Sequence, residues 1–119
     1  MGPDERLAAL GITLPAPAAV LGMYRPAVRS GAYVFVSGQL PTRDGAIVHP
    51  GRLGGEVSIE QGEEAARTAA VNALAAVRGL RGALEGLRVV RVVGYVACTP
   101  EFDQQPAVVN GAKIGRAHV

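Results

Sequence analysis

The sequence has few residues of the kinds that carry redox, metal or aromatic-stacking chemistry. Its 119 residues include one cysteine, two histidines and no tryptophan, and aromatic residues make up 4% of the chain. One cysteine excludes an internal disulfide, and two widely separated histidines with one cysteine predict no metal site. Hydrophobic residues nevertheless make up 49% of the chain. The core must therefore be built from valine, alanine and leucine.

The charges are also sparse and scattered. Twelve basic and ten acidic residues give a formal charge of +2, with no cluster of lysine and arginine. This pattern does not indicate a nucleic-acid partner. Asp4 and Glu5 stand where a secretory signal would carry positive charge, and Pro15 and Pro17 interrupt the apolar region 14–23. We therefore expect one small cytoplasmic domain with no membrane association.

Local patterns predict a mixture of helices and strands. Helix formers over 4–10 precede Gly11, which is typical of a short helix with a glycine cap. Residues 24–29 and 33–39 predict a hairpin, and Asp44-Gly45 predicts a tight turn before a short strand at 47–48. Ser58 and Gln61 match a capping box at the start of an alanine-rich amphipathic helix, which we expect Gly79, Gly82 and Gly86 to break.

The segment 88–98 predicts a long strand rich in β-branched residues. Valines lie on both of its faces, and Arg91 is the one charged residue between 89 and 98, so neither face is suited to water. A helix can cover one face, and we expect another subunit to cover the other. Cys98 ends this strand and has no base near it in sequence, which favours a packed thiol over a nucleophile.

The predicted strand 33–39 begins with four apolar residues and ends in Ser37-Gly38-Gln39, before Pro41. A hydroxyl, a bare backbone and an amide at the rim of a sheet are typical of a small-ligand site. A serine at a strand end also often bonds its own backbone, so a structural role for Ser37 stays open. Asn110, followed by Gly111, is either a turn residue or a polar residue carried by a helix toward a site.

Taken together, several segments resemble the Rid family of reactive-intermediate deaminases, also called YjgF-like or L-PSP-type proteins. The resemblance covers about residues 6–112 and is closest to a paralogous branch of the family. The matching segments are Tyr24-Arg25-Pro26-Ala27-Val28, residues 34–41, Asp44-Gly45, Asn72-Ala73-Leu74, residues 89–98, Phe102 and Asn110-Gly111-Ala112.

The resemblance implies a chorismate-mutase-like α+β fold, with a sheet packed by helices, and a homotrimer with ligand clefts between subunits. It further implies hydrolytic deamination of small reactive enamines and imines, the 2-imino acids, to 2-keto acids and ammonia without a cofactor. Tyr24, Ser37 and Asn110 match family positions that bind the small-molecule substrate. An arginine and a glutamate that carry the chemistry in active relatives are expected beyond residue 112, so no catalytic residue is assigned here.

The residues 113–119 have a separate explanation, which we state as a hypothesis. A common sequencing adapter, AGATCGGAAGAGCACACGTCTGA, preceded by one A, encodes Lys-Ile-Gly-Arg-Ala-His-Val and a stop codon, and all seven residues match. We therefore expect a single Rid-like domain over 1–112, incomplete at the C-terminus, followed by an adapter-derived tail. Such a truncated chain is not expected to be a competent enzyme. The alternatives are a non-catalytic module that binds or senses a small metabolite and, with less support from the charge pattern, a ribonuclease.

Overall fold

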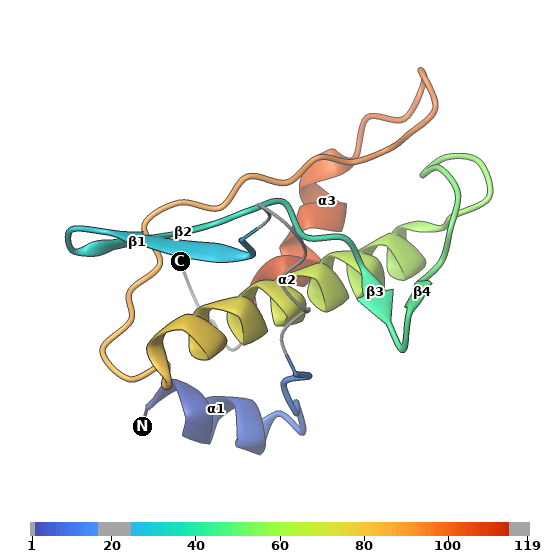
Figure 1. The fold of residues 1–119 in the computed structure, drawn as a ribbon. Coiled ribbons are helices and arrows are strands. Elements are labelled where there is room, and N and C mark those ends of the chain that lie inside the picture. The colour runs from blue at the N-terminus through green and yellow to red at the C-terminus, as the bar shows by residue number, and fades with distance from the viewer. Residues whose placement is uncertain (1, 17–24, 115–119) are drawn as a thin grey trace. The chain divides into compact units, whose positions relative to one another are not determined.

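The computed structural model describes residues 2–16 and 25–114 and has the expected α+β composition (Figure 1). The chain forms two compact units, one from residues 1–39 and 71–88 and the other from residues 40–70 and 89–119. The described part contains two sheets of two strands each, three α-helices and one 3-10 helix. Tyr24, one of the predicted site residues, lies outside the described residues.

The first unit begins with helix α1, Pro3–Ala9, close to the predicted range of 4–10. Pro3 suits the first turn because its missing N–H has no intrahelical partner there. Gly11 follows the helix with a φ of 72°, a left-handed conformation that favours glycine. The buried residues of this unit include Leu7, Leu14, Ala75, Ala76 and Leu84.

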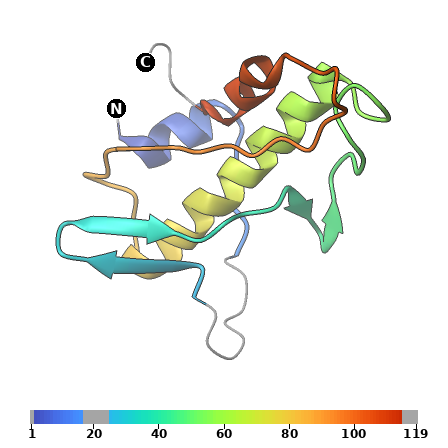
Figure 2. The same ribbon diagram turned by 90° about the horizontal axis from the view of Figure 1, so that it is seen from above.

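The same unit contains a hairpin of β1, Ala27–Ser30, and β2, Tyr33–Val36. The strands are antiparallel, with Ala27 opposite Val36 and Ser30 opposite Tyr33, and a tight turn at Gly31 joins them (Figure 2). The hairpin was predicted, although both strands are shorter than expected. Regular pairing ends at Val36, so Ser37 and its neighbours follow the strand as irregular backbone.

The second unit begins with a smaller hairpin, β3, Thr42–Arg43, and β4, Ala46–Ile47. Asp44 and Gly45 form its turn with φ values of 53° and 81°. Two consecutive positive φ values define the turn that best matches the twist of paired strands, and the Asp-Gly sequence provides them. The predicted turn is confirmed, and the following strand begins one residue earlier than expected.

Helix α2, Ile59–Arg81, starts at the predicted capping box. The Ser58 hydroxyl accepts a bond from the Gln61 N–H at 3.2 Å, and the Gln61 amide oxygen accepts one from the Ser58 N–H at 3.0 Å. Of the three glycines predicted to break the helix, Gly79 does not, since the helix continues to Arg81. An interior glycine costs a helix only about 1 kcal/mol. The helix ends at Gly82, as predicted, where φ is 85°.

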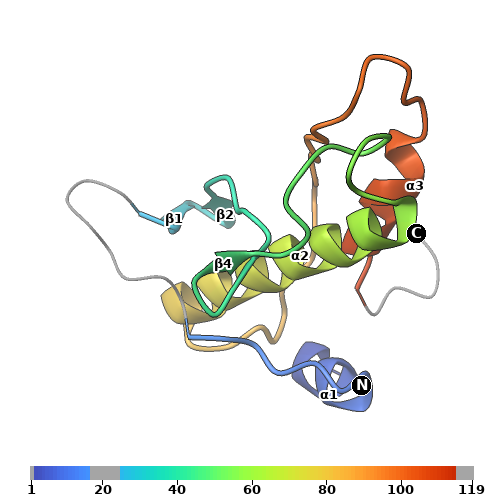
Figure 3. The same cartoon turned by 90° about the vertical axis from the view of Figure 1, so that its right-hand side faces the viewer.

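Helix α3, Gln105–Val109, and the 3-10 helix η1, Asn110–Ala112, lie beside the first turns of α2 (Figure 3). Val108 is buried with Leu53 and Val57 in the core of the second unit. The helices approach closely because glycine lines the contact. At Gly62 a Cβ would stand 2.8 Å from the Leu53 side chain, and at Gly111 it would meet the carbonyl oxygen of Glu63.

The predicted strand 88–98 is not formed, which corrects the sequence analysis. Only a single bridge joins Cys98 to Leu53, where the Leu53 N–H donates to Ala97 at 2.9 Å and the Thr99 N–H donates to Leu53 at 2.9 Å. A strand requires a partner for its backbone groups, and none pairs with residues 89–96 in the described part of the chain. Consequently Val90 is 71% exposed and Tyr95 is 94% exposed.

Candidate functional site

The polar end of β2 carries Ser37, Gly38 and Gln39. The carbonyl oxygen of Pro26 accepts two bonds from Ser37, one from its hydroxyl at 3.1 Å and one from its N–H at 3.0 Å. The Gln39 amide in turn donates to the Ser37 carbonyl at 3.1 Å. The structural alternative predicted bonds to the serine's own backbone, but the acceptor is Pro26 before the neighbouring strand. These bonds orient the half-buried hydroxyl just beyond β2.

Asn110 begins η1 directly after α3, with φ of −56° and ψ of −25°. Of the two roles left open by the sequence, the structure assigns it to a helix. Its side chain is exposed, and the following Gly111 contacts the backbone of α2. This close approach fixes the position of Asn110 within the second unit.

The three predicted substrate-binding residues are therefore not brought together in one described site. Ser37 belongs to the first unit and Asn110 to the second, and Tyr24 lies outside the described residues. What the structure defines is the local setting of two of them, namely an ordered polar strand end and an exposed amide at the start of a 3-10 turn.

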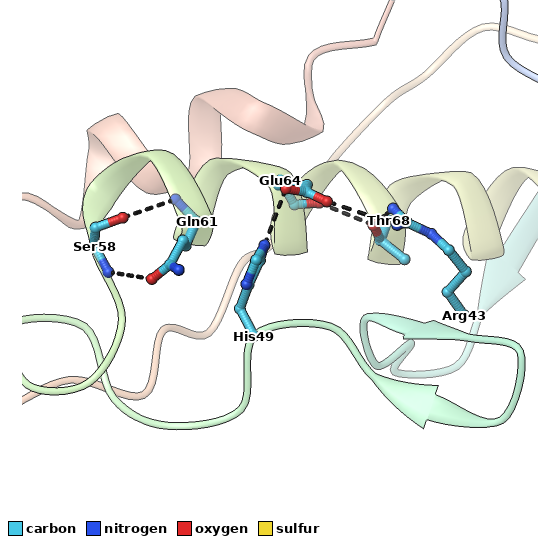
Figure 4. A network of polar contacts seen from close by, with 6 residues as sticks. All are labelled: Arg43, His49, Ser58, Gln61, Glu64 and Thr68. Carbon is cyan, nitrogen blue, oxygen red and sulfur yellow. Dashed lines mark hydrogen bonds and ion pairs between the residues drawn. The ribbon is translucent and has the colours of Figure 1, made fainter.

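A polar network in the second unit was missed by the sequence analysis. It comprises Arg43 from β3, His49 from the following loop, and Glu64 and Thr68 from α2 (Figure 4). The His49 Nε2 lies 2.9 Å from Glu64 Oε1, and the Arg43 Nη1 lies 3.6 Å from Glu64 Oε2. Arg43 also donates to the Thr68 hydroxyl at 3.1 Å, and that hydroxyl donates to the Glu64 carbonyl at 2.9 Å.

This network holds Glu64 in its ionised form. The hydrogen bond with His49 is the main cause that lowers the pKa of the Glu64 carboxyl, and the charge of Arg43 adds to the effect. His49 adopts a φ of 52°, which is uncommon for a residue with a side chain. The arrangement ties a loop and a hairpin to a helix within one unit. In the sequence, the only indication of this polar network is that Glu64 and Thr68 are separated by one helical turn.

No group of three or more acidic, histidine or cysteine side chains that could hold a metal ion occurs within residues 2–16 and 25–114. Cys98 is half-buried against the Leu53, Val57 and Val108 cluster, with the Gln105 amide 3.6 Å from its sulfur. This is the packed environment that the sequence predicted. No helix of the described chain is long and apolar enough to span a bilayer.

Comparison with known proteins gives the class to which this fold belongs. Residues 4–114 match the family described as "YjgF/chorismate mutase-like, putative endoribonuclease", so the chain belongs to that family. It is 38% identical over 104 residues to protein TCP17 of Trypanosoma cruzi, covering 87% of this chain. The chain spans 65% of the length of that relative.

Two solved structures are also similar. The protein Atu1372 of Agrobacterium tumefaciens, described as of unknown function, is 41% identical, with a TM-score of 0.77 over 92% of this chain and 67% of that protein. A protein of Shewanella oneidensis described as a "putative endoribonuclease" is 29% identical, with a TM-score of 0.80 over 98% of this chain and 83% of that protein. Both support the chorismate-mutase-like fold expected from the sequence.

Proposed function

We propose that this domain binds a small 2-imino or 2-keto acid at the polar end of β2. We further propose that the protein to which it belongs hydrolyses such imines to 2-keto acids and ammonia. The observation that carries the proposal is the placement of Ser37 beyond the strand, where its hydroxyl and its backbone N–H each donate one hydrogen bond to the Pro26 carbonyl. Membership of the YjgF-like family supports it.

The chemistry sets clear requirements for the site. Water adds to the carbon of the C=N bond, and the resulting carbinolamine loses ammonia to leave a C=O bond. A hydroxyl and an amide can orient the substrate, but gripping its carboxylate calls for a cation, which arginine supplies through two parallel hydrogen bonds. A carboxylate would help to orient the water. Ser37, Asn110 and Tyr24 are the proposed binding residues, and the arginine and glutamate implied by the family lie outside this set.

Binding is tested first, with 2-oxobutanoate as a stable analogue of the imine. In a titration followed by ¹H–¹⁵N NMR, we expect the amide signals of Ser37, Gly38 and Gln39 to shift. Ser37→Ala should abolish the shifts, whereas Ser30→Ala, which alters an exposed serine of β1 in the same unit, should leave them unchanged. Shifts that persist in Ser37→Ala would contradict the assignment.

Catalysis is tested separately, with 2-iminopropanoate generated from serine by a pyridoxal-phosphate dehydratase. We expect residues 1–119 to release pyruvate no faster than buffer does. A protein that continues this domain with the implied arginine and glutamate should accelerate the release. Acceleration by the 119-residue chain itself would show that its own residues suffice.

The same two proteins, the 119-residue chain and the continued protein, also distinguish two other functions. A non-catalytic metabolite-binding module would bind 2-oxobutanoate, yet the continued protein would not accelerate hydrolysis. The endoribonuclease named in the family description is a second candidate. RNA cleavage that co-elutes with the protein through rigorous repurification would support it, and loss of cleavage on repurification would remove it.

We also propose that the protein containing this domain assembles as a homotrimer. The exposed valines 89, 90, 92 and 93 support this, because a neighbouring subunit is the kind of partner that covers a segment with so many exposed apolar side chains. Light scattering coupled to size-exclusion chromatography measures the mass directly. A monodisperse monomer of the continued protein would overturn the proposal.

A further inference from the structure

A half-open cavity of about 420 Å³ lies at the surface of the first unit, between α1, the turn that follows it and Arg78 of α2. Its volume falls in the range of natural small-molecule sites. The cavity is amphipathic. Its apolar lining comes from Leu7, Ile12 and Leu14, and its polar lining from Asp4, Thr13 and Arg78.

The two charged residues face each other without forming a close bond. The Arg78 Nη1 lies 3.7 Å from the Asp4 Oδ1, beyond ordinary hydrogen-bond distance, and the side chains are 40% and 44% exposed. Ion pairs of this kind contribute little to stability. A ligand that bonds both charges can therefore replace the contact between them at small cost.

We propose that this cavity binds a zwitterionic α-amino acid with an aliphatic side chain. The ammonium and carboxylate of such a ligand are separated by one carbon, which matches a cation and an anion that lie side by side. Arg78 would receive the carboxylate through two N–H donors, and Asp4 would accept from the ammonium. The aliphatic side chain would lie mainly on Ile12, beside the small part of Leu7 and Leu14 that stays accessible. The site is separate from the end of β2, so it does not depend on the proposed deaminase function.

The ligand itself provides the first test, with L-leucine as the probe and ¹H–¹⁵N NMR of the full chain as the readout. Millimolar L-leucine should shift the amides of residues 7–14. N-acetyl-L-leucine, which lacks the ammonium, and 3-methylbutylamine, which lacks the carboxylate, should each bind at least about tenfold more weakly, since each loses charged hydrogen bonds. Equal shifts with all three probes, or none with L-leucine, would overturn the proposal.

Matched variants test the location. Ala8 lines the cavity and is exposed, so Ala8→Leu should fill the space without disturbing the core. Ala9→Leu changes the next residue of α1, which is exposed and does not line the cavity. We expect Ala8→Leu and Arg78→Gln to abolish the shifts and Ala9→Leu to keep them. Retention of L-leucine binding in a folded Ala8→Leu protein would exclude this cavity as the site.

Discussion

Replacement of Gly111 by alanine tests the closest helix approach in the second unit. A Cβ at this position would meet the Glu63 carbonyl oxygen and would lie 2.7 Å from its carbon and 2.8 Å from its Cα. Each of these atoms belongs to the backbone of α2, so no side-chain rotation can relieve the overlap. The segment formed by α3 and η1 must therefore move away from α2, which loosens the packing of Val108 against Leu53 and Val57.

This displacement determines how much the free energy of unfolding falls. Overpacking a tight contact costs about 1–3 kcal/mol, and partial loss of the buried Val108 contacts brings the expected cost to about 2–3 kcal/mol. In urea unfolding of a domain of this size, such a loss lowers the midpoint by roughly 1–2 M. Far-UV circular dichroism follows the transition, because α2 is the longest helix of the described chain.

Gly55→Ala provides the matched control in the same unit. Its Cβ would lie 3.4 Å from the Arg52 carbonyl oxygen and 3.5 Å from Thr99, at ordinary contact distance. We expect a change within about 0.5 kcal/mol. A Gly111→Ala protein that unfolds at the same urea concentration as Gly55→Ala would refute the close approach.

Three further changes have defined outcomes. Ser58→Ala removes the α2 cap and should cost about 1 kcal/mol in urea unfolding, whereas Ser58→Asp, another good cap, should cost much less. Glu64→Gln should destabilise the protein near neutral pH, where His49 hydrogen-bonds to an ionised carboxylate and the Arg43 guanidinium forms an ion pair with it. Because the folded pKa of Glu64 lies below its usual 4.5, this stability is present above that value and is lost as pH falls through the folded pKa. The difference between the melting temperatures of the two proteins should therefore shrink in acid, and a constant difference would contradict the ion-pair assignment. Leu84→Ala should cost about 2–5 kcal/mol because Leu84 is only 1% exposed, whereas Leu80→Ala, at 43% exposed, should cost much less; similar urea midpoints would contradict that burial difference.

The features predicted correctly from the sequence depend on residues close together in the chain. The Ser58 and Gln61 cap, the Asp44-Gly45 turn and the cap at Gly11 each follow from the conformational preference or hydrogen bonding of a few neighbouring side chains. The orientation of Ser37 is not of this kind, because its acceptor is the carbonyl of Pro26, which the pairing of β1 with β2 brings near.

The features that the sequence did not predict depend on distant residues. Arg43, His49 and Glu64 come from three separate elements, and nothing in their spacing indicates that they meet. The segment 88–98 has strong β propensity, but propensity supplies no partner strand for its backbone. Gly79 has an unfavourable intrinsic propensity, which the rest of a long helix overrides.

Helix α2 has a consequence for how the molecule folds. Its first half belongs to one compact unit and its second half to the other, yet it is one continuous run of hydrogen bonds. Helices are costly to nucleate and easy to extend, so a nucleus formed at the Ser58 cap can propagate into the second half. The two units therefore share a single cooperative element. A proline introduced near the middle of α2 should make their unfolding transitions separate.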